Sequence, residues 1–225
     1  FMMIHLAREK KSIAIDYREM AGALTTKSIF LDGRGEFEPQ KSQSSGLGVG
    51  VPGTVAGFAL AVEKYGSGKF KLADLLQPAI ELARDGIDVD ADLADSLPFA
   101  ARRLGRYPSS KAIFLRADGT ALRRGDRLVQ KDLANTLEMI AREGPRGFYD
   151  GEVARRIIEA VNRENGRMTL EDFQSYKAVE RNVVRGSYRG REIVSMPPPS
   201  SGGIHVIQIL NLLEGFDLGR LGHNS

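Results

Sequence analysis

The most informative stretch of the chain lies near its C-terminal end and reads Met196-Pro197-Pro198-Pro199-Ser200-Ser201-Gly202-Gly203-Ile204-His205. Each proline fixes its own φ and lacks an N–H group, so the segment is predicted to be extended. Ser200 or Ser201 can cap the start of a helix, and the two glycines allow backbones to approach closely. The apolar run that follows predicts a helix over 204–213. A helix N-terminus can also bind an anion, but a cap and a tight turn are the favoured interpretation.

Composition sets broad limits on the function. The chain has 225 residues, of which 42% are hydrophobic and 27% charged, and its formal net charge is +3. This balance is typical of a folded domain with a sizeable core. The small positive charge is spread along the sequence, so we expect neither nucleic acid nor an anionic membrane surface as a partner. We also expect no transmembrane helix, because the sequence has no long apolar run.

Residue usage also narrows the chemistry. Cysteine is absent, which excludes disulfides, thiol catalysis and thiolate metal sites. The three histidines, His5, His205 and His223, lack metal-ligand spacing. We therefore expect no metal and no cofactor.

Both ends of the sequence suggest an internal piece of a longer precursor. The segment 1–6 has the pattern of an apolar strand already under way, without a start signal, a signal peptide or a polar tail. At the other end, Asn224 or Ser225 is placed to cap a new helix.

The order of expected elements is strands, many helices, strands and a last helix. Strands are predicted at 1–6, 12–16, 179–184 and 191–195, and a hairpin around the Asp118-Gly119 turn with a strand at 113–116. The main helices are predicted at 54–64, 90–104, 131–142, 152–164 and 204–213, with a short one capped by Thr169. In the segment 72–84, Pro78 predicts a break, with a new helix beginning at the proline. This order favours an α+β or layered α/β fold.

A long exposed loop is predicted over 33–50, because this stretch is rich in glycine, serine and charge. Its Gly46-Leu47-Gly48-Val49-Gly50 run is only superficially like a phosphate loop. It has neither a following Lys-Ser or Lys-Thr pair nor GxGxxG spacing.

The sharpest candidate binding residue is Arg18, in Asp16-Tyr17-Arg18-Glu19. An arginine just past an apolar strand is held on a rigid element, and its planar fork of donors matches a carboxylate. Alternatively, Arg18 pairs internally with Asp16 or Glu19. Spacing alone favours this second interpretation.

Thr25 and Thr26 suggest a threonine nucleophile, but they lie within continuous chain. A threonine nucleophile uses its own freed α-amino group as the base, which requires a chain start. No catalytic residue is therefore predicted in this sequence.

Seven segments together resemble the γ-glutamyltranspeptidase family, also called γ-glutamyltransferase or glutathione hydrolase. The segments run in family order over nearly the whole chain. They are Phe1–Met3, Ala14–Met20, Val51–Gly57, Gln77–Gly86, Gly147–Tyr149, Tyr176–Arg181 and Met196–Gly203.

This resemblance implies the αββα four-layer fold of N-terminal-nucleophile hydrolases, with residues 1–225 as a single-domain, truncated, helix-rich portion of the large chain. Such a precursor cleaves itself, and the new N-terminal threonine of the small chain attacks a γ-glutamyl amide. The resemblance also implies that Arg18 binds the substrate α-carboxylate. Tyr17 stands where the family also has phenylalanine.

The resemblance further implies a heterodimer with the small catalytic chain, a substrate such as glutathione, and a periplasmic or extracellular location. The nucleophile and the oxyanion donors would lie in the small chain, so we expect this chain alone to be inactive. Two alternatives remain: a glutaryl (cephalosporin-type) acylase of the same family, and a non-catalytic binding or scaffold module with the same fold.

Overall fold

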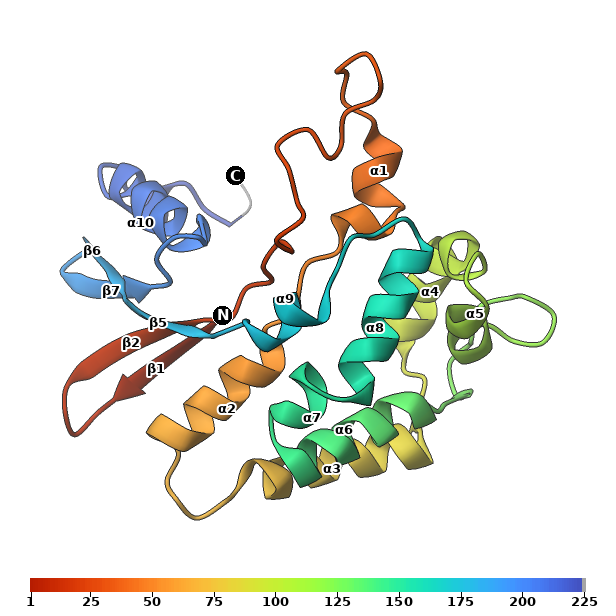
Figure 1. Cartoon of the computed structure of the whole chain (residues 1–225). Coiled ribbons are helices and arrows are strands. Elements are labelled where there is room, and N and C mark those ends of the chain that lie inside the picture. Colours follow the sequence, from red (N-terminus) through yellow and green to blue (C-terminus); the bar gives the residue numbers. More distant parts are fainter. Residues whose placement is uncertain (224–225) are drawn as a thin grey trace. The chain divides into compact units, whose positions relative to one another are not determined.

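The computed structural model describes residues 1–223 and divides the chain into two compact units (Figure 1). The first unit joins Phe1–Gly66 to the segment that begins at Arg155, and the second spans Ser67–Ala154. The helix cap expected at Asn224 or Ser225 lies outside the described residues. Among residues 1–223, no helix has both the length and the apolar character that a membrane span requires.

A three-stranded antiparallel sheet forms the centre of the first unit. Its order is β1 (Met2–Leu6), β2 (Lys11–Asp16) and β5 (Val179–Asn182), so β2 lies in the middle. The middle strand is the most buried, with Ala14 and Ile15 fully excluded from solvent. The two N-terminal strands predicted from the sequence are confirmed, and the register pairs Ile15 with Glu180 of β5.

A second, two-stranded sheet follows at once along the chain. β6 (Val184–Tyr188) pairs with β7 (Arg191–Ser195), and α10 (Gly202–Leu213) packs against this hairpin (Figure 1). The prediction of one strand over 179–184 is wrong, because the chain leaves the first sheet after Asn182 and enters the second at Val184. A change of partner strand leaves no mark in the alternation of apolar residues.

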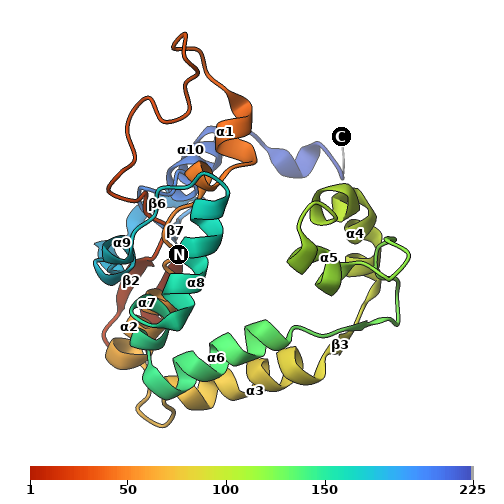
Figure 2. The ribbon, with the colours of Figure 1, turned by 45° about the vertical axis from the view of Figure 1, so that its right-hand side comes forward.

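Helices account for most of the second unit. α3 (Leu72–Asp85) packs along α6 (Lys131–Glu143), and Figure 2 shows the two side by side. The predicted break at Pro78 is wrong, since α3 continues through it. Proline removes one intrahelical hydrogen bond, but α3 buries Ile80 and Ala83 beyond it, and tertiary packing of an apolar face supplies most helical stability.

The predicted strand at 113–116 is also wrong. Pro108 is the first residue of α5 (Pro108–Phe114), a position for which its fixed φ is suited. Only an isolated bridge between Leu115 and Ala121 remains of the hairpin. The turn at Asp118-Gly119 is confirmed, because the Gly119 N–H donates to the Arg116 carbonyl at 2.9 Å.

The remaining elements complete the two units. The loop expected over 33–50 contains two short helices. The full set of these elements is α1 (Pro39–Gln43), η1 (Gly46–Gly48), α2 (Thr54–Tyr65), β3 (Ile87–Asp88), α4 (Ala91–Leu104), β4 (Arg127–Leu128), α7 (Arg146–Tyr149), α8 (Glu152–Arg163), α9 (Leu170–Gln174) and η2 (Leu218–Arg220).

A buried carboxylate ties α9 to the chain that follows β2. The Asp172 side chain accepts hydrogen bonds from the Ala23 N–H at 2.7 Å, and from the N–H and the hydroxyl of Thr169 at 2.8 Å each. Thr169 caps α9 as predicted, completing a capping box. Burial opposes ionisation of Asp172, but these hydrogen bonds outweigh it and lower its pKa.

Asp172→Asn is expected to destabilise the protein by about 1–3 kcal/mol, because the amide group faces donors that need an acceptor. The lowered pKa means that the contribution of Asp172 is complete above its ordinary pKa of 3.8 and is lost as the pH falls through the lower folded-state value. Urea unfolding of the full-length protein between pH 7 and pH 2 measures this. Glu171→Gln, at an exposed neighbour on α9, should change stability by less than about 0.5 kcal/mol. If the free energy of unfolding falls with pH in the same way for Asp172→Asn and for the unmodified protein, Asp172 does not make the contribution described.

Candidate carboxylate-binding site

Arg18 lies two residues beyond the end of β2, and its side chain is 49% exposed. Its guanidinium carbon is 6.0 Å from the centre of the Phe1 ring, and its Nε is 3.4 Å from Glu19 Oε1. Exposed ion pairs of this kind contribute roughly 0–1 kcal/mol. The internal partner Asp16, which the sequence also allowed, is engaged by Arg181 instead, at 2.7 Å. The Arg18 guanidinium is therefore held only weakly by its neighbours.

The main chain of Arg18, in contrast, is firmly held. Asp16 has a side chain that is only 9% exposed; its Oδ1 accepts the Arg18 N–H at 3.0 Å and its Oδ2 accepts Arg181 Nε. On the other side, the Tyr176 hydroxyl donates to the Arg18 carbonyl oxygen at 2.7 Å. A buried carboxylate and a tyrosine thus fix both polar groups of one residue's backbone.

The start of α2 packs directly against the Arg18 segment. Gly53 is the N-cap residue, and a Cβ there would lie closer than 3.0 Å to the Tyr176 hydroxyl and to the Tyr17 carbonyl oxygen. Gly57, one turn further, faces the Tyr17 ring in the same way. Glycine is normally inferior to serine, asparagine or aspartate as a cap and costs about 1 kcal/mol inside a helix. Here the close approach of α2 requires it.

Tyr17 anchors the segment through its side chain. Its hydroxyl donates to the Phe1 carbonyl oxygen at 2.8 Å, and its ring meets Phe58 edge-on with centroids 6.0 Å apart. Burial raises the pKa of Tyr17, which keeps the hydroxyl protonated. Met20 lies two residues beyond Arg18. It exchanges two backbone hydrogen bonds with Val51, at 3.2 and 2.7 Å.

Three of the segments that carried the family resemblance therefore meet around Arg18: 14–20, 51–57 and 176–181. The sequence pointed to Arg18 as a candidate, but it did not indicate Tyr176 or the Asp16–Arg181 pair beside it. Tyr176 and Arg181 are more than 150 positions from the residues that they contact, so no local pattern reveals these contacts. The only signal in the sequence was that all of these residues lie in segments that resemble the family.

The Ser200–Gly203 stretch forms a tight corner. Ser201 is the N-cap residue of α10 but its side chain makes no capping bond, whereas the Ser200 hydroxyl accepts from the Gly202 N–H at 3.3 Å. A Cβ on Gly203 would overlap the Met196 carbonyl oxygen. Gly203 therefore lets α10 start hard against the end of β7. The tight turn agrees with the favoured interpretation, but the side-chain cap expected from Ser201 is not formed.

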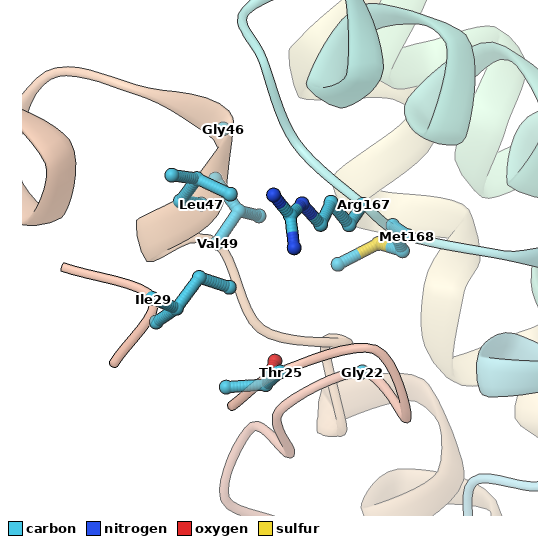
Figure 3. A pocket seen from close by; sticks show the side chains of 8 residues that line it. All are labelled: Gly22, Thr25, Ile29, Gly46, Leu47, Val49, Arg167 and Met168. Carbon is cyan, nitrogen blue, oxygen red and sulfur yellow. The ribbon is translucent and has the colours of Figure 1, made fainter. Parts of the chain in front are cut away.

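Two of the remaining candidates, Thr25 and the start of the glycine-rich run, lie at a small, shallow pocket (Figure 3). Thr25 and Gly46 line it, and the Arg167 side chain extends toward Leu47 and Val49. Thr25 lies in a turn of continuous chain, with its N–H bonded to the Gly22 carbonyl at 3.0 Å. It therefore has no free α-amino group to serve as a base.

The glycine-rich run is explained by packing. The Gly46 N–H donates to the Glu164 carbonyl at 2.6 Å, and a Cβ on Gly46 would overlap the Val161 carbonyl oxygen. Of the histidines, His5 bonds to Ser12 across the β1–β2 pair at 2.9 Å and His205 is exposed on α10. Residues 1–223 contain no group of three or more histidine, cysteine, aspartate or glutamate side chains that could hold a metal ion.

Comparison with known proteins identifies the class. The sequence model of the family described as Gamma-glutamyltranspeptidase matches residues 1–225, so the chain belongs to this family. It is 48% identical over 226 residues to the "Glutathione hydrolase proenzyme" of Escherichia coli (strain K12), an alignment that covers 100% of this chain and 38% of the relative. It is 41% identical over 177 residues to the "Acylase ACY 1 proenzyme" of Pseudomonas sp. (strain V22), covering 79% of this chain and 31% of the relative.

The fold agrees with that membership. The crystal structure of Helicobacter pylori gamma-glutamyltranspeptidase matches with a TM-score of 0.92 at 44% identity, covering 100% of this chain and 63% of that one. The mixture of helices and strands and these neighbours confirm the α+β, N-terminal-nucleophile hydrolase class expected from the sequence. The chain spans 38% of the length of the Escherichia coli relative.

Proposed function

We propose that this chain is the large-chain portion of a γ-glutamyltransferase or glutathione hydrolase proenzyme, and that it supplies Arg18 as the group that binds the α-carboxylate of the γ-glutamyl donor. The observation that carries the proposal is the contrast at Arg18. Its backbone is fixed on both sides, while its side chain is 49% exposed and makes only a long, exposed contact with Glu19 and a contact with the Phe1 ring at 6.0 Å. That is the arrangement of a preorganised side chain with a free binding face.

The carboxylate would bind by replacing Glu19 at the guanidinium. Arginine presents two parallel N–H donors to a carboxylate, which fixes the orientation of the ligand as well as its position. Holding the α-carboxylate in one place fixes where the γ-carbonyl carbon lies, and such positioning can lower the barrier of an attack by several kcal/mol.

The chemical step is assigned to the small chain of the same precursor. The hydroxyl oxygen of its N-terminal threonine bonds to the γ-carbonyl carbon, the amide C–N bond breaks, and the amine leaves with the hydroxyl proton. Water or an acceptor amine then attacks the ester, which releases glutamate or a new γ-glutamyl amide and restores the threonine hydroxyl. This chain alone is inactive under the proposal.

The exposed apolar side chains of α10 are consistent with a partner chain that covers this helix. The residues from Gly202 to Leu213 include no charged side chain, and Ile204, Ile209 and Leu212 are 44%, 54% and 69% exposed. Although the polar His205, Gln208 and Asn211 are also exposed on α10, an exposed group of large apolar side chains of this kind marks an interaction surface. The occupant we propose is the small chain, in a heterodimer. We place the enzyme in the periplasm or outside the cell.

The full-length proenzyme is expected to separate into two chains on a denaturing gel and to turn over γ-glutamyl-p-nitroanilide and glutathione. The alternative of a non-catalytic scaffold predicts an intact precursor without turnover, and this result would contradict the proposal. Heating the precursor before processing gives the inactive control.

An acylase is the second candidate function, because one relative bears the name Acylase ACY 1 proenzyme at 41% identity. A glutaryl group keeps the carboxylate and lacks the α-amino group, so Arg18 suits both donors. Rates measured on glutathione and on a glutaryl amide separate them. A higher kcat/KM for glutathione supports the first function, and the reverse supports the acylase.

A further inference from the structure

The contact between Tyr176 and Arg18 joins two segments that are 158 residues apart. Tyr176 follows α9 directly, and it is 9% exposed. Its hydroxyl donates to the Arg18 carbonyl oxygen at 2.7 Å, while its ring end approaches Gly53 at the start of α2. The hydroxyl therefore acts on the backbone of Arg18 and leaves the guanidinium free.

The hydroxyl remains a donor at all ordinary pH values. Burial, with the nearby charges of Asp16 and Glu19, raises the pKa of Tyr176 to about 12. Loss of the proton would place a phenolate beside a carbonyl oxygen and two carboxylates, which is electrostatically unfavourable.

The hydrogen bond from Tyr176 to the Arg18 carbonyl oxygen also restricts the position of the Arg18 side chain. The Arg18 N–H is fixed by Asp16, so the carbonyl is the second point that stops the backbone from rotating about this residue. The guanidinium stands at the end of a long flexible stem, and small backbone rotations displace it by much larger distances. A bidentate contact tolerates little displacement.

We propose that Tyr176 is a positioning residue for carboxylate binding, acting through the carbonyl oxygen of Arg18. This inference rests on the proposed function, since it assumes that Arg18 binds the donor α-carboxylate. Tyr176 touches neither donor nor nucleophile in this account.

The test compares two donors in the full-length processed enzyme. γ-Glutamyl-p-nitroanilide carries the α-carboxylate, and 4-aminobutyryl-p-nitroanilide is the same donor without it. Tyr176→Phe keeps the ring and removes the hydroxyl. It is expected to lower kcat/KM for the γ-glutamyl donor about threefold to tenfold, the effect of one lost neutral hydrogen bond, with no change for the 4-aminobutyryl donor. Tyr107→Phe, at a tyrosine that is 37% exposed in the other unit, is the matched control and should leave both donors unaffected.

A double-mutant cycle with Arg18→Ala separates positioning from general destabilisation. In the Arg18→Ala background, Tyr176→Phe should have no further effect on the γ-glutamyl donor. Independent effects of the two substitutions, an equal loss on both donors, or a Tyr176→Phe protein that does not accumulate as two chains would each overturn the inference. If Arg18→Ala itself leaves the γ-glutamyl donor unaffected, the proposed function fails first, and this single-variant result identifies that failure.

Discussion

Arg18→Ala is expected to lower kcat/KM for γ-glutamyl-p-nitroanilide by roughly 30-fold to 5,000-fold in the full-length processed enzyme. The range corresponds to about 2–5 kcal/mol for the loss of a bidentate charged contact. The loss of activity is not expected to come from unfolding, because the Arg18 side chain contributes little to the fold. Its ion pair with Glu19 is long and exposed. Steady-state kinetics with the processed enzyme measure the effect.

Two further variants make this prediction specific. Arg18→Lys keeps the charge but loses the planar fork, so an intermediate loss is expected. Arg8→Ala removes an exposed arginine from the turn between β1 and β2 and should leave the kinetics unchanged. A loss for Arg18→Ala that is confined to a small change in KM would show that the carboxylate binds elsewhere.

Gly53→Ala is expected to destabilise the protein by about 3 kcal/mol, the upper end of the usual range for overpacking. The added methyl group would overlap the Tyr176 hydroxyl and the Tyr17 carbonyl oxygen, and the second of these is backbone that cannot move aside by a rotamer change. The helix start and the Arg18 segment must therefore separate. The same variant should raise KM for the γ-glutamyl donor, since the shift displaces Arg18.

The midpoint of urea unfolding, followed by circular dichroism on the full-length protein, measures the stability change. Gly33→Ala is the matched control, because nothing lies within 4 Å of a Cβ at Gly33, and its effect should stay below about 0.5 kcal/mol. A Gly53→Ala protein as stable as the control would mean that α2 does not pack against Arg18 as described.

Local signals in the sequence were enough for much of the fold. The alternation before Asp16 predicted β2, and Thr169 predicted the cap of α9. Where prediction failed, a tertiary effect prevailed. The break predicted at Pro78 does not occur, because α3 is stabilised by its packing. The change of sheet at Val183 depends on which strand lies alongside the chain there.

The candidate site was predictable only in part. Arg18 could be singled out because a strand end followed by arginine is a local pattern. The Asp16–Arg181 pair and the Tyr176 hydroxyl could not, because they depend on contacts across 165 and 158 residues. The glycines at 53 and 57 were visible in the sequence, but their reason was not, since close approach of a helix to a tyrosine has no local signature.

We propose that Arg18 binds the α-carboxylate of the donor, and the most direct measurement of this is the ratio of kcat/KM for γ-glutamyl-p-nitroanilide to that for 4-aminobutyryl-p-nitroanilide. We predict a high ratio in the unmodified enzyme and a fall of roughly 30-fold to 5,000-fold in Arg18→Ala, with the 4-aminobutyryl rate unchanged. An equal loss on both donors, which would leave the ratio constant, would contradict the account.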